Sequence, residues 1–208
     1  SERVEDTSTT THTVYGGENS GAVYAKNGST VVINKTAPQT SANVDITGKE
    51  IIDPITGAAT GNYAGFGLYA ADGAKINARN NYVKVTNGGT AIASTGNTSS
   101  EVDLTGGTVE YDGKGYALHS ADGGKINLTS GTLTLRGEAT GYSSNVTLTT
   151  QPITLTGATL NVFSDDVIVT NLKGVNTFNT NGSIINGANP IGTYIPIASI
   201  VNTDPATG

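Results

Sequence analysis

The sequence predicts an all-β protein built as one parallel β-helix, a coil of stacked strands with roughly 24 residues in each rung. The first observation is a repeat: residues 67–77 return almost unchanged at 117–127, and a weaker copy lies at 22–29. Repetition at a near-fixed interval marks a solenoid, because each small unit buries its apolar face against copies of itself.

A second series gives the same interval. A Leu-Thr-Gly template begins at three leucines that are 24 and then 27 residues apart, Leu104, Leu128 and Leu155. The segment 91–94 also fits between the two strong copies of the first series. Tandem helical repeats are excluded, because the residues between the copies show no apolar stripe of period 3.6.

Alternation of apolar and polar residues is the third observation. Val102 and Leu104 before the small residues of the template, and Val109 and Tyr111 after them, predict two strands with one face inside and one in water. The same pattern returns at 126–135. We therefore expect two short strands and a corner at each Leu-Thr-Gly unit, in a three-sided coil.

Glycine, asparagine and aspartate predict the corners of the first series, because these residues tolerate positive φ. The expected corner dipeptides are Asn27-Gly28, Asp72-Gly73 and Asp122-Gly123. Such dipeptides also favour antiparallel hairpins in a sandwich or barrel. A hairpin fold does not require its turns to recur at one spacing, whereas a coil must, so the repeat favours the coil.

Composition agrees with stacked strands around a narrow interior. The chain has 28 Gly, 33 Thr, 20 Asn and no Trp among 208 residues, and 13% of the residues are charged. The net charge of −6 and the scattered Lys and Arg do not fit a nucleic-acid partner or an anionic membrane surface. Cysteine is absent, which excludes disulfides and thiol chemistry. No run of 18 apolar residues predicts membrane insertion, and the missing initial Met indicates a processed protein or an excised fragment.

We expect three zones along the chain. Residues 1–20 form a polar approach segment or an incomplete rung, residues 20–163 form the repeated β-helix, and residues 164–208 continue it with degenerate rungs and an open end. Segments 38–42 and 53–62 depart from the alternation and are expected to project as loops. The copies at 22 and 67 are 45 residues apart, which the period predicts to be close to two rungs.

These Gly-, Thr- and Asn-rich, Cys-free repeats resemble the passenger regions of autotransporter (type V secreted) surface proteins of Gram-negative bacteria. The resemblance covers about residues 20–163 and depends on the Gly-[Leu/Val]-Tyr-Ala-x-[Asp/Asn]-Gly units and the Leu-Thr-Gly units. It implies a right-handed β-helix, outside the cell, anchored through a C-terminal translocator barrel that this chain lacks. Many relatives of this kind are adhesins. The shared units are structural, so no catalytic residue is carried over.

An outer acidic patch is the best candidate for chemistry. By alternation it faces outward on the two strands around 105–107, and it consists of Glu101, Asp103, Glu110 and Asp112. Paired carboxylates can serve as acid and base or bind a hard cation. No Arg or His accompanies the cluster in the sequence, so we interpret it as a solvated acidic face.

Other candidates predict no site. His119 occupies the position of Tyr24 and Tyr69 in the other copies, which indicates a packing or surface-row role. Asp165 and Asp166 are adjacent in a predicted strand and point to opposite faces. Neither a metal, including calcium, nor another cofactor is predicted.

The sequence thus predicts a non-enzymatic adhesion or interaction scaffold that binds a host or bacterial cell-surface glycan or protein. It binds through a flat face of Thr, Asn and acidic side chains or through the loops at 38–62. The alternatives are a stalk that spaces a distal domain, an enzyme acting on polysaccharide through the outer acidic patch, and self-association between cells.

Overall fold

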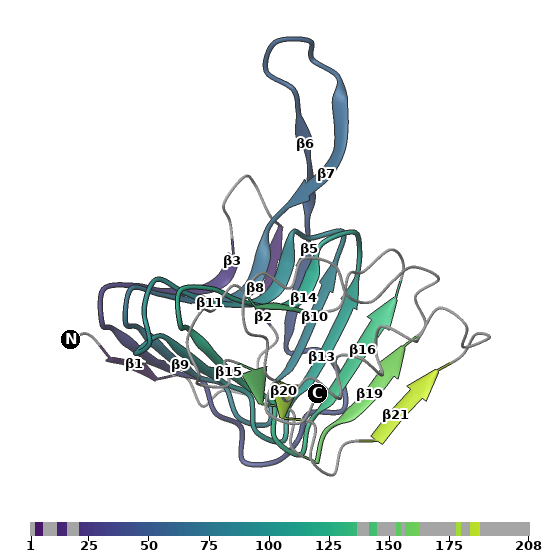
Figure 1. Cartoon of the computed structure of the whole chain (residues 1–208). Coiled ribbons are helices and arrows are strands. Elements are labelled where there is room, and N and C mark those ends of the chain that lie inside the picture. The colour runs from purple at the N-terminus through teal and green to yellow at the C-terminus, as the bar shows by residue number, and fades with distance from the viewer. Residues whose placement is uncertain are drawn as a thin grey trace, which may run out of the picture.

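A computed structural model of the chain describes residues 3–5, 12–15, 21–136, 142–144, 153–154, 157–162, 178–179 and 184–187. These residues form strands, turns and bends and contain no helix, which confirms the predicted all-β class. Most of the strands lie in three parallel sheets (Figure 1). Leu155, Asp165 and Asp166 lie outside the described residues.

The described strands divide among the sheets as follows. Sheet A contains β1 (Arg3–Glu5), β4 (Thr30–Val32), β9 (Lys75–Asn77), β12 (Glu101–Asp103), β15 (Lys125–Asn127), β18 (Ile153–Thr154) and β20 (Phe178–Asn179). Sheet B contains β2 (His12–Tyr15), β5 (Val44–Thr47), β10 (Tyr82–Thr86), β13 (Thr108–Asp112), β16 (Thr132–Arg136), β19 (Thr159–Val162) and β21 (Ile184–Gly187). Sheet C contains β3 (Gly21–Ala25), β8 (Phe66–Ala71), β11 (Thr90–Thr95), β14 (Tyr116–Ser120) and β17 (Tyr142–Ser144).

Successive strands from β8 to β19 visit sheets C, A and B in turn, and we call one such visit a cycle. Equivalent residues of neighbouring cycles are register partners: Val102 pairs with Ile126, 24 residues on, and Ile126 with Ile153, 27 residues on. Ile92 pairs with both Leu68 and Leu118, as the placement of 91–94 predicts. The sequence interval is therefore the interval of parallel pairing.

The core lies between the three sheets. Inward side chains form columns from cycle to cycle, and these side chains are almost completely buried, among them Leu68, Ile92 and Leu118 of sheet C, Ile76, Val102 and Ile126 of sheet A, and Val83, Val109 and Leu133 of sheet B. Leu104 and Leu128 are fully buried. Burial alternates along β10 and β13, as the period-two pattern predicts. Hydrophobic burial at these columns thus holds each cycle on the next.

The residues of the predicted corners have positive φ angles. Asn27, Asp72 and Asp122 have φ of 56°, 52° and 53°, and the glycine after each also has positive φ. Corners of successive cycles are joined, since the Gly28 N–H donates to the Asp72 carbonyl at 3.1 Å. These residues turn the chain between sheets C and A and have a structural role.

The largest departure from the cycle is an antiparallel hairpin. Strands β6 (Lys49–Ile52) and β7 (Ala59–Ala64) pair with each other and stand out from the three sheets (Figure 1). Residues 59–62, expected in a loop, belong to β7, whereas 38–42 form a surface bend with Gln39 bonded to Asn80.

The copies at 22 and 67 are 45 residues apart because of an insertion within one cycle, not because two rungs separate them. Val23 and Leu68 are direct register partners, so the prediction of nearly two rungs between these copies is wrong. One cycle is enlarged by the hairpin and by the bend at 38–42. The hairpin lies between β5 of sheet B and β8 of sheet C, whereas the bend lies between β4 of sheet A and β5 of sheet B.

Candidate functional site

The outer face of sheet C carries two columns of side chains. In β8 the two residues between Phe66 and Tyr69 are buried, and the two aromatic residues stand on the outer face. Strand β14 repeats this arrangement with Tyr116 and His119. Register aligns Phe66 and Tyr116 with Thr90 of β11, and aligns Tyr69 and His119 with Ala93. The strand between the two aromatic pairs thus carries small side chains at both positions.

Contacts fix the aromatic side chains on either side of β11. The rings of Phe66 and Tyr69 meet edge to face with centroids 5.1 Å apart, and Tyr24 of β3 contacts both of these rings. On the other side, Tyr116 and His119 stack with centroids 5.3 Å apart. Aromatic pairs of this kind stabilise by about 0.5–1.5 kcal/mol beyond their buried area, so both walls are held in place.

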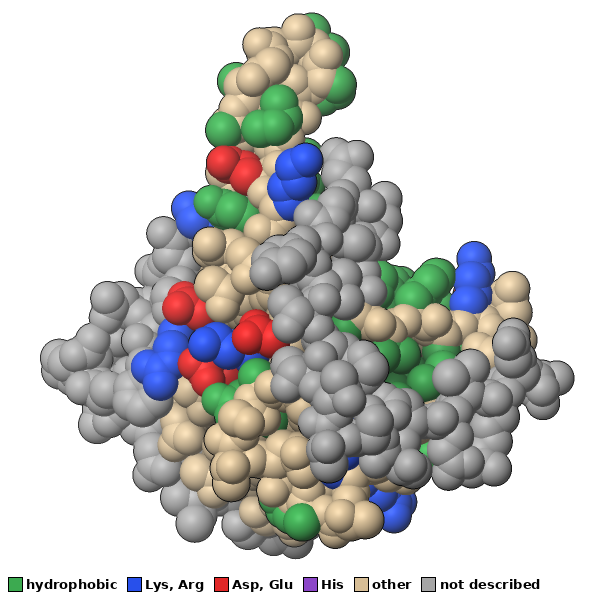
Figure 2. All heavy atoms as spheres, turned by 180° about the vertical axis from the view of Figure 1, so that it is seen from behind, with side chains coloured by type: hydrophobic (Ala, Val, Ile, Leu, Met, Phe, Trp, Pro, Cys, Tyr) green, Lys and Arg blue, Asp and Glu red, His purple; other side chains and the backbone are tan. Residues whose placement is uncertain are grey.

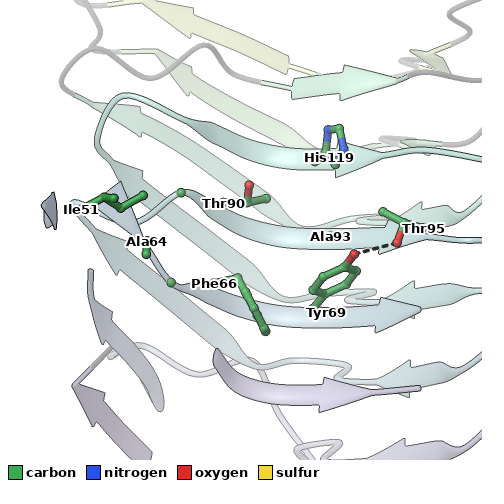
Figure 3. A pocket seen from close by; sticks show the side chains of 10 residues that line it. Ile51, Ala64, Phe66, Tyr69, Thr90, Ala93, Thr95 and His119 are labelled. Carbon is green, nitrogen blue, oxygen red and sulfur yellow. Dashed lines mark hydrogen bonds between the residues drawn. The ribbon is translucent and has the colours of Figure 1, made fainter. Parts of the chain in front are cut away.

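A pocket of about 300 Å³ lies along β11 between these walls (Figure 3). We call it the aromatic groove, and its lining includes Phe66, Tyr69, Thr90, Ala93, Thr95 and His119, together with Ile51, Ala64, Gly65 and Gly89. Ile51 and Ala64 belong to the hairpin, so the insertion supplies part of the wall. The small residues of β11 thus form the floor of the groove, and the hairpin closes one end of it.

Two hydroxyl groups lie at the far end of the groove from the hairpin. The Tyr69 hydroxyl and Thr95 Oγ1 are 2.8 Å apart, and either can donate (Figure 3). A pair of hydroxyls has two hydrogens and uses one between them, so the other can be donated to a ligand. The pocket lining thus combines aromatic rings with a donor and acceptor.

His119 is predominantly uncharged at neutral pH. Burial lowers the pKa of His119, and the charge of Asp122 opposes this effect without reversing it. A neutral imidazole adds an aromatic wall without bringing a net charge into the groove. The predicted surface-row role of His119 fits its position, but the sequence reasoning missed the groove.

The outer acidic patch is divided between two sheets. Glu101 and Asp103 lie on β12 in sheet A, whereas Glu110 and Asp112 lie on β13 in sheet B. The expectation that no Arg accompanies the patch is wrong. Arg79 Nε contacts Asp103 at 2.7 Å and Arg136 Nε contacts Glu110 at 3.2 Å, because stacking brings residues 24 and 26 apart together.

Asp103 is a structural carboxylate. Its side chain is only 8% exposed, and its Oδ1 accepts hydrogen bonds from the backbone N–H and the hydroxyl of Thr105. Burial raises the pKa of Asp103, but the bonds from Thr105 and Arg79 outweigh this and hold the pKa below its ordinary value. A carboxylate that is ionised, covered and fully bonded is not poised to transfer a proton.

Glu110 belongs to a mixed-charge surface. It accepts a 2.5 Å hydrogen bond from the Tyr82 hydroxyl and contacts Arg136. Burial and the neighbouring Glu110 carboxylate raise the pKa of Tyr82 to about 12. Burial also raises the pKa of Glu110, but Tyr82, Lys84 and Arg136 outweigh this and hold the pKa of Glu110 below its ordinary value. Figure 2 shows acidic and basic side chains interspersed below the hairpin. Opposite charges on neighbouring strands stabilise a sheet surface by small amounts, so this face has a structural explanation.

Neither a metal centre nor a membrane-spanning helix occurs in the described part of the chain. No group of three or more His, Asp or Glu side chains there is arranged to hold a metal ion. Within the same ranges, no helix has the length and apolar character that a membrane crossing requires.

The aromatic groove has two signals in the sequence, and the first is the alignment of His119 with Tyr69 and Tyr24. The complementary signal is the pair Thr90 and Ala93, which interrupts the aromatic columns. Comparison with known proteins gives no family for this architecture: no protein-family model, curated protein or solved structure matches the chain.

Proposed function

We propose that the chain is a segment of a single right-handed, three-sided parallel β-helix that is exposed on a bacterial cell surface as an autotransporter passenger. Its function is to act as an adhesion or interaction scaffold that binds a cell-surface glycan or protein. Parallel pairing at 24 to 27 residues and the cyclic order of sheets support the β-helix. The repeat resemblance supports the surface location.

The observation that carries the binding role is the coincidence of the hairpin and the aromatic groove. A solenoid needs no insertion for its own stability, because each cycle is completed by its neighbours. This chain nevertheless adds strands β6 and β7, which pair with each other and wall the groove through Ile51 and Ala64. Insertions on one face of a repeat array are typical of binding surfaces.

The hairpin tip is a second contact surface at the same level. Ile55 is 93% exposed and Ile52 is 46% exposed, and Figure 2 shows apolar side chains at the projecting end of the molecule. Exposed large apolar side chains on a projecting turn are positioned to bury area against a partner. We therefore place the binding surface on the hairpin and the adjoining outer face of sheet C.

The geometry gives the enzyme alternative less support. The carboxylates of the outer acidic patch fall on two sheets, and Asp103 and Glu110 have arginine partners. Glycoside hydrolysis requires two carboxyl groups that flank one substrate bond, with one of them protonated. We assign these residues to stabilisation of sheets A and B.

The test compares the full chain with a variant in which residues 49–64 are replaced by two glycines. The hairpin pairs only with itself among the described strands, so this variant is expected to keep the three sheets. Both proteins are applied to an array of host and bacterial cell-surface glycans and proteins. We expect specific binding by the full chain and its loss in the variant. Equal binding by both contradicts the assigned surface, and no binding by either supports the stalk instead.

A further inference from the structure

We propose that the aromatic groove binds a neutral glycan through a gluco-configured pyranose unit, such as glucose or N-acetylglucosamine. This inference deepens the proposed function and rests on it. Three properties of the groove support this inference: its dimensions, the chemistry of its walls, and the pairing of the strands below it on both sides.

The dimensions of the groove select a ring rather than a folded segment. Its volume of about 300 Å³ is at the lower end of the range for ligand pockets, roughly 300–1,000 Å³. Tyr69 and His119 lie on β8 and β14, and the backbones of these two strands are about 9.6 Å apart at the usual strand spacing. A single saturated ring fits between such walls, whereas a helix does not.

The walls combine aromatic rings with hydroxyl groups and contain no Asp, Glu, Lys or Arg. Aromatic faces carry negative potential and attract polarised C–H bonds, which a sugar ring presents. The Tyr69 and Thr95 hydroxyls and the Thr90 side chain supply polar contacts for sugar hydroxyls. Lowering of the His119 pKa keeps the lining uncharged at neutral pH. An acidic or basic sugar finds no counter-charge here, so the ligand is neutral.

Walls on both sides favour the gluco configuration. A pyranose with all ring substituents equatorial has axial C–H bonds on both faces and can contact a wall on each side. A galacto ring places an axial hydroxyl at C4, and a manno ring places one at C2. Each of these rings therefore loses apolar contact on one face.

An extended peptide is a poorer fit to the same surface. Strand addition needs a free sheet edge, but β8, β11 and β14 are each paired on both sides. The groove lies over the middle of sheet C, where backbone donors and acceptors already serve the ladder. A peptide is thus limited to side-chain contacts.

The experiment uses the full chain, calorimetric titration and four neutral tetrasaccharides: cellotetraose, chitotetraose, β-1,4-galactotetraose and β-1,4-mannotetraose. Thr90→Tyr fills the groove with a residue type that the same column already accepts at Tyr116. Thr108→Tyr is the matched control, because it adds the same ring beside its register partner Tyr82 on sheet B and does not line the groove. Circular dichroism checks that both variants keep the sheets.

We expect saturable binding of at least one gluco-configured probe, with the galacto and manno probes weaker by roughly tenfold, or 1.4 kcal/mol. Thr90→Tyr is expected to weaken binding at least tenfold, and Thr108→Tyr to leave it within about twofold. Binding that ignores sugar configuration, or that survives Thr90→Tyr, overturns the inference. Hairpin-dependent array binding to proteins alone, with no tetrasaccharide bound, also overturns it while leaving the proposed function intact.

Discussion

Arg79 Nε lies 2.7 Å from Asp103 Oδ2, so a guanidinium that is 59% exposed covers a carboxylate that is 8% exposed. Arg79 lies in the turn after β9 and Asp103 lies in β12 of the next cycle, so this contact depends on the stacking of one cycle on the next. Solvent screens the charge of the exposed Arg79, whereas the buried carboxylate of Asp103 depends on its protein partners for stabilisation of its charge.

Replacement of Arg79 by Ala is expected to lower the free energy of unfolding by about 1–2 kcal/mol, because Asp103 keeps its Thr105 bonds but loses its cation. Arg79→Lys should recover part of the loss. Lys26→Ala is the control: its contact with Asp72 is 3.6 Å long and half-exposed on both sides, so we expect a change below about 0.5 kcal/mol. Urea unfolding measures all three. Equal effects at Arg79 and Lys26 would contradict the structural role of Asp103.

Asp103 also predicts acid sensitivity. Its pKa is lower in the folded chain than its ordinary value, so the unfolded chain binds the proton more tightly. The stabilisation is therefore fully present above about pH 4, near the ordinary value, and is lost as the pH falls through the folded pKa. Asp103→Asn should be less stable at neutral pH and show a flatter decline below pH 4. Parallel stability curves for the two proteins would refute the assignment.

Gly124 and Gly28 form a matched pair for close packing between cycles. A Cβ at Gly124 would lie 2.2 Å from the Ser94 carbonyl oxygen of the preceding cycle, whereas a Cβ at Gly28 meets nothing within 4 Å. We expect Gly124→Ala to cost about 3 kcal/mol through this backbone clash. Gly28→Ala should cost about 1 kcal/mol, because alanine is strained at its φ of 71°. Chemical denaturation compares the two, and the reverse order would be inconsistent with the backbone contact.

Tyr111 supplies the largest fully buried side chain of the described core. Its hydroxyl donates to the Gly88 carbonyl at 2.5 Å and accepts from the Gly115 N–H at 2.7 Å. Tyr111→Phe should lower the free energy of unfolding by about 1–3 kcal/mol, because both groups lose this partner. Tyr24→Phe, at a half-exposed ring, is expected to change it by less than about 0.5 kcal/mol. A neutral Tyr111→Phe in thermal or urea unfolding would show that the hydroxyl bonds contribute little.

Local pattern was sufficient to predict the parts of the fold that repeat. Asp72 and Asp122 turn corners with nearly the same φ, and Leu104 and Leu128 are buried alike, because each cycle solves the same packing problem. Alternation also placed Asp103 on the outward side, but its cover comes from Arg79 in another cycle. That contact depends on three-dimensional register, which residue types alone do not reveal.

The aromatic groove lay beyond sequence reasoning for a similar reason. The repeat aligns His119 with Tyr69. Their role as groove walls depends on the small side chains of β11, the strand that lies between them. The hairpin at 49–64 has no counterpart among the other described strands, so the repeat could not indicate its direction or the contact of Ile51 with the groove. Features that occur once are outside the reach of an argument from repetition.

The central claim is that residues one cycle apart lie directly over one another, and a disulfide tests it most directly because the chain has no cysteine. Glu101 and Lys125 are register partners on the outer face of sheet A, with Cα atoms expected about 4.8 Å apart and within disulfide range. The doubly substituted chain Glu101→Cys with Lys125→Cys should cross-link on mild oxidation. Glu101→Cys with Thr132→Cys, which joins sheets A and B, should not. Failure of the first pair, or equal cross-linking of both pairs, would contradict the stacking.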